Sequence, residues 1–157
     1  MDRFKGTEID RKFFDSKTGL AKFCNVNNID FYRYKDSMQW GGRPAPAVPA
    51  DAHMAIPKGF AYIELKATTG YGVLSLRLLR KSQLAKVLEC IKTGVDYLLV
   101  VYYEDINKFA IFNLLDYSDY IIRKKMTIHY IRDSKKVIVC NSMEDTFKAI
   151  YNEIKVR

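Results

Sequence analysis

Two acidic residues and one lysine have the types and spacing needed for metal-assisted chemistry on phosphate esters. Asp51 stands thirteen positions before Glu64-Leu65-Lys66. Residues 60–66 are expected to form a strand, in which residues two apart point to the same side. Glu64 and Lys66 then share a face, while Leu65 points into packing. Two carboxylates can hold a hard divalent cation, and an ammonium can steady a water or a phosphate beside it.

The same residues also allow a purely structural interpretation. The spacing from Asp51 to Glu64 is common in proteins. A glutamate and a lysine on a solvated strand face often form no more than an ion pair. Burying such a pair is costly unless the charges have a task, so the surrounding elements must distinguish the two interpretations.

Composition indicates a globular chain with an acidic partner. The 157 residues are 48% hydrophobic, which suits one domain over 1–157 with a real core. The formal net charge of +8 favours nucleic acid or an anionic membrane surface as partner. No apolar run approaches the roughly 18 residues of a membrane span, and the N-terminus lacks a secretion-signal pattern. We therefore expect no membrane association and a cytoplasmic or nucleoid-associated protein, or one of the host cytoplasm if it is viral.

Other familiar site types are missing from the sequence. The three cysteines, Cys24, Cys90 and Cys140, are odd in number and widely spaced, which argues against a disulfide framework or a zinc knuckle. Each is expected to be a small buried hydrophobe. There is no Walker-type glycine loop, so no small-molecule cofactor is expected. His53 and His129 are too isolated for a histidine-based nuclease.

The pattern of elements predicts an α/β sandwich with a mixed sheet. A capping box at residues 7–10 opens a helix that fades near Thr18-Gly19, and residues 23–28 are ambiguous. A proline-rich loop leads to Asp51. The further elements expected are a strand over 29–35, a hairpin of strands 52–56 and 60–67, a helix over 81–92, strands over 97–103 and 108–114, and a last helix from Ser142.

The helix over 81–92 is the most regular of these. Ser82 is its expected cap and Gly94 its end. Its expected buried stripe consists of Leu84, Val87, Leu88 and Ile91. The continuous apolar run over 97–103 predicts a central strand buried on both faces.

This order of elements and motifs resembles the archaeal and phage Holliday-junction resolvases (Hjc-like) and the RecU-like resolvases. These are small, dimeric members of the PD-(D/E)xK nuclease superfamily. The resemblance covers about residues 5–114. It is carried by Gly6-Thr7-Glu8, by Gly41-Gly42-Arg43-Pro44, by Asp51 with Glu64-Leu65-Lys66, and by 76–83, which ends in Gln83. The family's Pro-Asp is replaced by Pro49-Ala50-Asp51, and residues 115–157 form an unassigned extension.

The resemblance implies a restriction-endonuclease-like fold and a Mg²⁺-dependent endodeoxyribonuclease that resolves four-way junctions by paired phosphodiester hydrolysis. Asp51, Glu64 and the backbone carbonyl of Leu65 would hold Mg²⁺, with Mn²⁺ able to substitute. Glu8 would complete the metal site, although a glutamate in a first helical turn also suits the helix dipole alone. Lys66 would orient the attacking water or contact the phosphate, and Gln83 would position that water or Lys66. Paired cuts of a two-fold symmetric junction imply a homodimer.

Basic residues give a candidate DNA-binding surface. Lysine and arginine contacts to phosphate supply affinity that does not depend on base sequence. The candidates are Arg43 in the loop, Arg77, Arg80, Lys81 and Lys86 around the 81–92 helix, and Arg123, Lys124 and Lys125 in the C-terminal region.

Two alternatives to junction resolution stay open. One is a restriction-type or repair endonuclease of the same superfamily, whose sequence-reading element would have to lie in 115–157. The other is a non-enzymatic basic nucleic-acid-binding domain, in which Asp51, Glu64 and Lys66 make salt bridges only.

Overall fold

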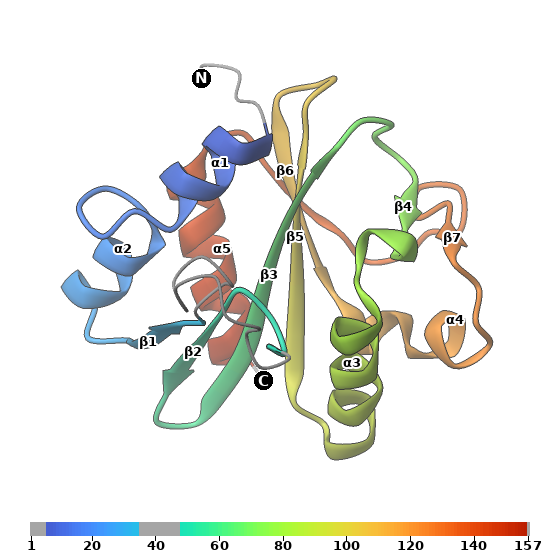
Figure 1. The fold of residues 1–157 in the computed structure, drawn as a ribbon, viewed down its shortest axis with the longest axis horizontal. Coiled ribbons are helices and arrows are strands. Elements are labelled where there is room, and N and C mark those ends of the chain that lie inside the picture. The colour runs from blue at the N-terminus through green and yellow to red at the C-terminus, as the bar shows by residue number, and fades with distance from the viewer. Residues whose placement is uncertain (1–5, 35–47, 157) are drawn as a thin grey trace, which may run out of the picture.

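The computed structural model describes residues 6–34 and 48–156. A six-stranded sheet with the strand order β1-β2-β3-β5-β6-β8 runs through these residues (Figure 1). Its strands are β1 (Asp30–Arg33), β2 (Ala52–Ile56), β3 (Gly59–Thr68), β5 (Asp96–Tyr103), β6 (Lys108–Asn113) and β8 (Ile138–Cys140). Two short strands, β4 (Leu74–Ser75) and β7 (Thr127–Ile128), pair with each other.

Helices cover both sides of the sheet. In Figure 1, α1, α2 and α5 lie on one side, and α3 and α4 on the other. The helices are α1 (Gly6–Phe13), α2 (Leu20–Val26), α3 (Lys81–Thr93), α4 (Ser118–Ile122) and α5 (Met143–Val156), with short 3-10 turns η1 (Leu76–Leu78) and η2 (Leu114–Tyr117). In the described part of the large sheet, only the pair β3–β5 is parallel. The predicted central mixed sheet flanked by helices is confirmed.

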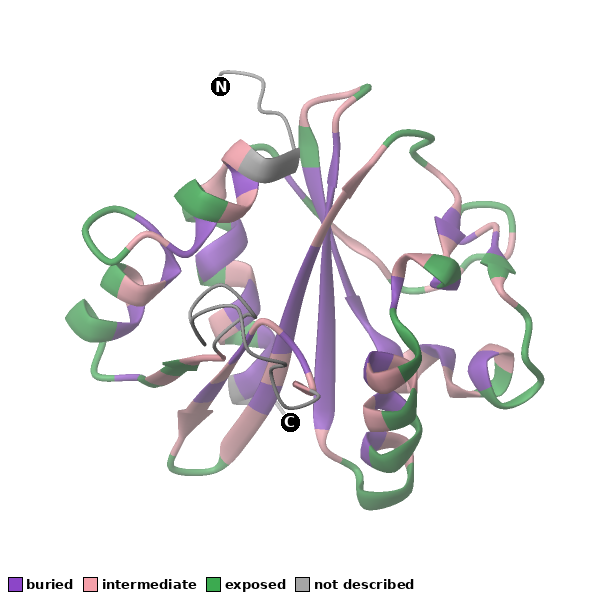
Figure 2. Cartoon of the chain, viewed as in Figure 1, coloured by how far each residue is buried: buried purple, intermediate pink, exposed green. Residues whose placement is uncertain are grey.

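Strand β5 lies at the centre of the core, as its apolar run predicts. All eight of its residues are buried. Leu98 and Val100 pack on the side of α1 and α5, while Leu99 and Val101 pack on the side of α3. Figure 2 shows burial concentrated along β3, β5 and β6. These buried strands form the rigid base from which the polar side chains of β3 project.

The β2–β3 hairpin is confirmed, with small shifts at its ends. Its register runs from Ala52 opposite Ile63 to Ile56 opposite Gly59. A side chain at Gly59 would meet the Cγ2 atom of Ile154 at 2.6 Å, so helix α5 requires a glycine where β3 begins. This close packing fixes the hairpin against the core.

Helix α3 differs from the prediction at its start and on its buried face. Its N-cap is Arg80, not Ser82, because the Gln83 side chain accepts a hydrogen bond from the Arg80 backbone N–H. The predicted Leu88 is 41% exposed, and Gln83 and Cys90 are buried instead. The helix ends at Gly94, whose φ of 74° confirms the expected left-handed cap.

The N-terminal region holds two helices where one was predicted. Helix α1 ends at Phe13, before the expected Thr18-Gly19, and the ambiguous segment 23–28 lies mostly in α2. A side chain on Gly19 would meet the backbone oxygen of Phe13 at 2.5 Å, so the chain turns tightly there. The predicted strand 29–35 is present as β1, and Lys35 lies outside the described residues.

The C-terminal residues are part of the core. Strand β8 pairs with β6, and α5 places Phe147, Ile150 and Ile154 in the main hydrophobic cluster. Helix α5 begins as predicted, with the Ser142 hydroxyl accepting from the Asp145 N–H at 3.1 Å. The segment after residue 114 therefore completes the sheet.

Two composition-based expectations can be compared with the fold. All three cysteines are free and buried, as expected. Within 6–34 and 48–156, no helix has the length and apolar character needed to cross a membrane.

Candidate active site

The hairpin register brings Asp51 and Glu64 together. Ala52 pairs with Ile63, so the next position of the ladder sets Asp51 opposite Glu64. Opposite residues of an antiparallel pair share a face. The ladder stops at this point, and the Asp51 Oδ2 atom accepts the Leu65 backbone N–H at 2.8 Å. The N–H and C=O of one strand residue point to the same edge, so the Leu65 carbonyl also faces the Asp51 side.

The Glu64 carboxylate is buried and only half satisfied. Its side chain is 1% exposed. The Oε1 atom accepts from Gln83 Nε2 at 2.7 Å and lies 3.3 Å from Lys66 Nζ. The Oε2 atom is buried without a hydrogen-bond partner among the described residues. A buried acceptor of this kind is costly unless a proton or a cation satisfies it.

Burial raises the pKa of both carboxylates. Burial raises the pKa of Asp51 to about 6, while the Leu65 N–H opposes this rise. Burial, together with the charge of Asp51, raises the pKa of Glu64 to about 7 against the attraction of Lys66. A divalent cation between the two carboxylates would stabilise their ionised forms and lower both pKa values.

Gln83 connects the site to the start of α3. It is fully buried, and it donates to Glu64 while accepting from the Arg80 N–H at 2.9 Å. Its amide therefore fixes both the helix start and one oxygen of Glu64. The resemblance predicted a role for Gln83 beside Lys66 or the attacking water, and the structure shows its contact with Glu64, although a glutamine near a helix start is usually solvated.

Removing this amide should weaken the fold. We expect Gln83→Ala to lower the free energy of unfolding by about 1–3 kcal/mol, because it leaves Glu64 and the helix start without a buried partner. Ser82→Ala is the matched control, since Ser82 is not the cap, and it should change stability by less than about 0.5 kcal/mol. Urea unfolding at neutral pH measures both. Equal stability of the two variants would contradict the role given to Gln83.

Helix α1 carries the predicted Glu8 and a second carboxylate, Asp10, whose charge reaches the site. Glu8 pairs with Lys12 at 3.5 Å on the helix surface. Asp10 is the α1 residue whose charge raises the pKa of Asp51. Its Oδ2 atom accepts from Arg33 Nη2 at 3.0 Å. In the sequence, Asp10 is marked only by its position next to Ile9, at the edge of the buried face of helix α1.

The donor set fits a hard cation. The carboxylates of Asp51 and Glu64 and the Leu65 carbonyl are all oxygen ligands, which suit Mg²⁺ with several waters retained. The unpartnered Oε2 atom of Glu64 is the observation that favours this fit. The described residues contain no cluster of three or more His, Cys, Asp or Glu side chains able to hold a metal, so water or substrate would have to supply the remaining ligands.

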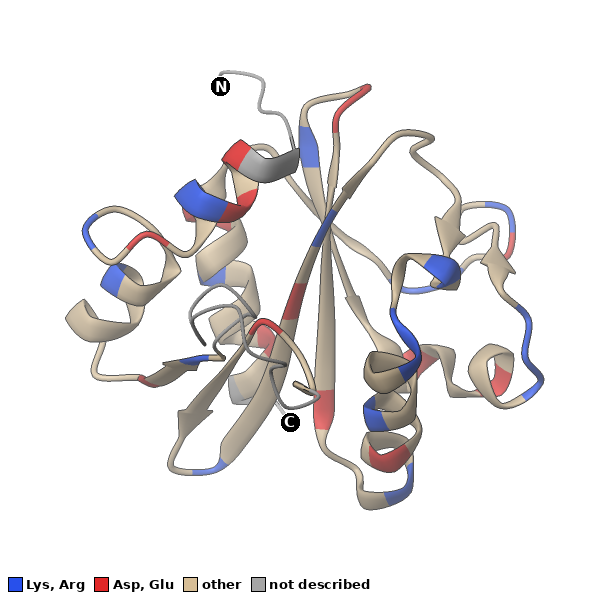
Figure 3. Ribbon diagram, viewed as in Figure 1, with Lys and Arg blue, Asp and Glu red and all other residues tan. Residues whose placement is uncertain are grey.

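The predicted basic residues lie mainly on the α3–α4 side of the sheet (Figure 3). The charge of Arg80 acts on Glu64, and Lys86 pairs with Glu89 at 3.1 Å. Exposed members of this group are Arg77, Arg80, Lys81, Arg123, Lys124 and Lys125. Arg43 and the glycines beside it lie outside the described residues.

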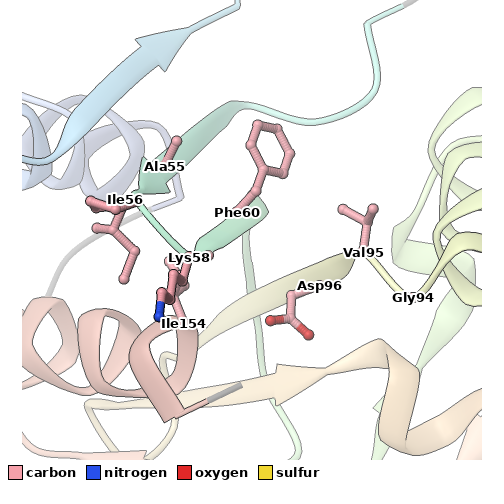
Figure 4. A pocket seen from close by; sticks show the side chains of 10 residues that line it. Ala55, Ile56, Lys58, Phe60, Gly94, Val95, Asp96 and Ile154 are labelled. Carbon is pink, nitrogen blue, oxygen red and sulfur yellow. The ribbon is translucent and has the colours of Figure 1, made fainter.

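A hollow of about 600 Å³ opens at the other end of the hairpin (Figure 4). Glu64 is five residues beyond Gly59 along β3, roughly 16 Å at the rise of a strand. The carboxylate that lines the hollow, Asp96, accepts from Asn113 Nδ2 at 2.9 Å. The hollow is therefore separate from the carboxylate site. Its lining is Ala55, Ile56, Pro57, Lys58, Gly59, Phe60, Gly94, Val95, Asp96 and Ile154.

Among the comparisons with known proteins, the one with solved structures finds a match. No protein-family model matches the chain, and no curated protein matches its sequence. Among solved structures, the chain is similar to Hjc, a Holliday junction resolvase from the archaeal hyperthermophile Archaeoglobus fulgidus. The identity is 13% and the TM-score 0.43, over 69% of this chain and 77% of that chain. The function proposed below therefore rests on the side chains of the site and their geometry.

Proposed function

We propose that the protein is a Mg²⁺-dependent endodeoxyribonuclease that resolves four-way DNA junctions as a homodimer. The observation that carries the proposal is the pair Asp51 and Glu64, with Lys66 alongside and one Glu64 oxygen buried without a partner. If Glu64 and Lys66 formed only an ion pair on a solvated strand face, Glu64 would not be as little as 1% exposed. The positive charge of the chain supports a polyanionic substrate.

Each residue has a separate task in this mechanism. Asp51, Glu64 and the Leu65 carbonyl would hold the cation, and Gln83 keeps one Glu64 oxygen engaged. When bound, Mg²⁺ supplies an activated water and neutralises charge developing at the phosphorus. The Lys66 side chain is 22% exposed, so its ammonium can reach a substrate phosphate or the attacking water. Basic residues around α3 would hold the neighbouring phosphates.

Cleavage assays on three labelled substrates test this function. We expect the four-way junction to be cut in Mg²⁺ and left intact in EDTA, with linear duplex and single strand cut much more slowly. Junction affinity should exceed duplex affinity and fall steeply with salt. Equal cutting of junction and duplex would favour a restriction-type or repair endonuclease. Binding without cleavage in Mg²⁺ or Mn²⁺ would favour the non-enzymatic domain.

Paired cutting further requires two linked sites. Sedimentation should give about twice the 18.2 kDa chain mass, and a cruciform plasmid should become linear within one binding event. A nicked circle as the sole product would exclude junction resolution while leaving nuclease activity intact.

A further inference from the structure

Aromatic side chains form a continuous strip across the three strands at one edge of the sheet. Tyr32 on β1, His53 on β2 and Tyr62 on β3 are successive register partners. The rings of Tyr32 and His53 stack at 5.6 Å between centroids. Phe60 lies 4.9 Å from His53 and 5.0 Å from Tyr62. Tyr34 completes the strip through its ring contact and its 2.8 Å hydrogen bond with His53.

The strip shares its sheet face with the two carboxylates. Asp51 is two residues from His53, and Glu64 is two residues from Tyr62, so both point to the same side. The carboxylates form the next row, roughly 7 Å away along the strands. The opposite face of β2 and β3, with Met54 and Ala61, packs into the core.

The rings of the strip are partly exposed to solvent, Tyr32 most of all. Tyr32 is 50% exposed, and Tyr34, His53, Phe60 and Tyr62 are half-buried. A single exposed aromatic residue is ordinary on a protein surface. Five adjoining, partly exposed rings next to a pair of buried carboxylates form a surface suited to flat apolar groups.

Positive charge accompanies the strip toward α3. The Lys86 Nζ atom lies 5.6 Å from the centre of the Tyr62 ring. The same ammonium forms an ion pair with Glu89. Lys66 follows Glu64 on the same face of β3, and the charge of Arg80 reaches Glu64. Aromatic rings beside cationic side chains are the combination by which proteins hold single-stranded nucleic acid, through base stacking and phosphate contacts.

We propose that the strip stacks unpaired nucleotides of the strand that reaches Asp51 and Glu64. The substrate class is then DNA with unpaired nucleotides beside the cleaved phosphate, such as an opened branch point or a flap. This inference rests on the proposed function for the cut, but the binding surface itself can be tested without cleavage.

Binding of an oligo-dT strand in EDTA tests the strip directly. Stacking on an aromatic side chain is worth enough that Tyr32→Leu and Tyr62→Leu should each weaken binding on the order of tenfold. Tyr32→Phe and Tyr62→Phe keep the rings and should bind like the wild type. Tyr71→Leu removes an exposed tyrosine outside the strip and should also leave oligo-dT binding unchanged. Affinity for a blunt duplex should be the same in all five variants.

Thermal unfolding of each variant separates loss of the strip from loss of the fold. Substitution of Tyr32 should disturb the fold least, because this side chain is 50% exposed. Folded leucine variants that bind oligo-dT like the wild type would overturn the inference. So would leucine variants whose loss of binding coincides with conversion of a dimer to a monomer, because the strip would then join two copies of the chain. Ring-dependent binding without any cleavage in Mg²⁺ would support the strip while contradicting the nuclease.

Discussion

Glu64→Gln is expected to abolish DNA cleavage while leaving DNA binding intact. The amide keeps the size of the side chain, and its oxygen can still accept from Gln83. It removes the charge that would hold Mg²⁺ beside Asp51. A metal ion stabilises the transition state by several kcal/mol, and each 1.36 kcal/mol is tenfold in rate, so we expect a loss of about 10³-fold or more. Single-turnover cleavage of a four-way junction measures it.

Glu144→Gln is the matched control for this variant. Its side chain is 77% exposed on α5 and pairs with Lys148 at 3.5 Å. It should cut at the wild-type rate, and both variants should bind the junction in EDTA with wild-type affinity. Normal cleavage by Glu64→Gln would remove Glu64 from the site and leave Asp51 without a partner for the metal.

The parts of the fold that the sequence predicted are those where one local pattern dominates. An apolar run of strand length located β5, and the turn residues 57–59 located the hairpin. Helix α2 was missed because its seven residues contain only two buried side chains, Leu20 and Cys24, too few for a clear period. The short strands β7 and β8 were missed for a related reason, since their pairing depends on distant residues of β4 and β6.

The site residues also divide into those that a local sequence pattern predicts and those whose positions depend on tertiary packing. Glu64 and Lys66 could be placed on one face from strand alternation alone, whereas the position of Asp51 opposite Glu64 depends on the hairpin register. The burial of Gln83 against Glu64 depends on how α3 packs on β3, and the approach of Asp10 depends on α1 and β1 together. The aromatic strip was missed because its members come from three strands, and a single strand does not reveal the register that joins Tyr32 to His53 and Tyr62.

Without metal, the wild-type protein should lose stability as pH rises from about 4 to 8. In unfolded chains, Asp and Glu have pKa values of about 3.9 and 4.3. In the fold, burial and the charge of Asp10 raise the pKa of Asp51 to about 6, and burial and the charge of Asp51 raise that of Glu64 to about 7. The native state therefore binds more protons than the unfolded state in this window, so raising the pH favours unfolding. The combined effect of the two raised pKa values is on the order of several kcal/mol.

The difference between wild type and Glu64→Gln isolates this effect from the other carboxylates. In EDTA at pH 5, Glu64 is largely protonated and resembles the amide, so the two proteins should have similar free energies of unfolding. At pH 8 the variant should be more stable by a few kcal/mol, because it lacks the buried charge and relieves Asp51 of its neighbour. Added Mg²⁺ should stabilise the wild type at pH 8 and have little effect on the variant. Urea unfolding of both proteins at the two pH values, with and without Mg²⁺, measures these differences in the free energy of unfolding. A difference between the proteins that does not change with pH would show that Glu64 is ionised in the fold as readily as in the unfolded chain. The case for a cation at this pair of carboxylates would then lose its electrostatic basis.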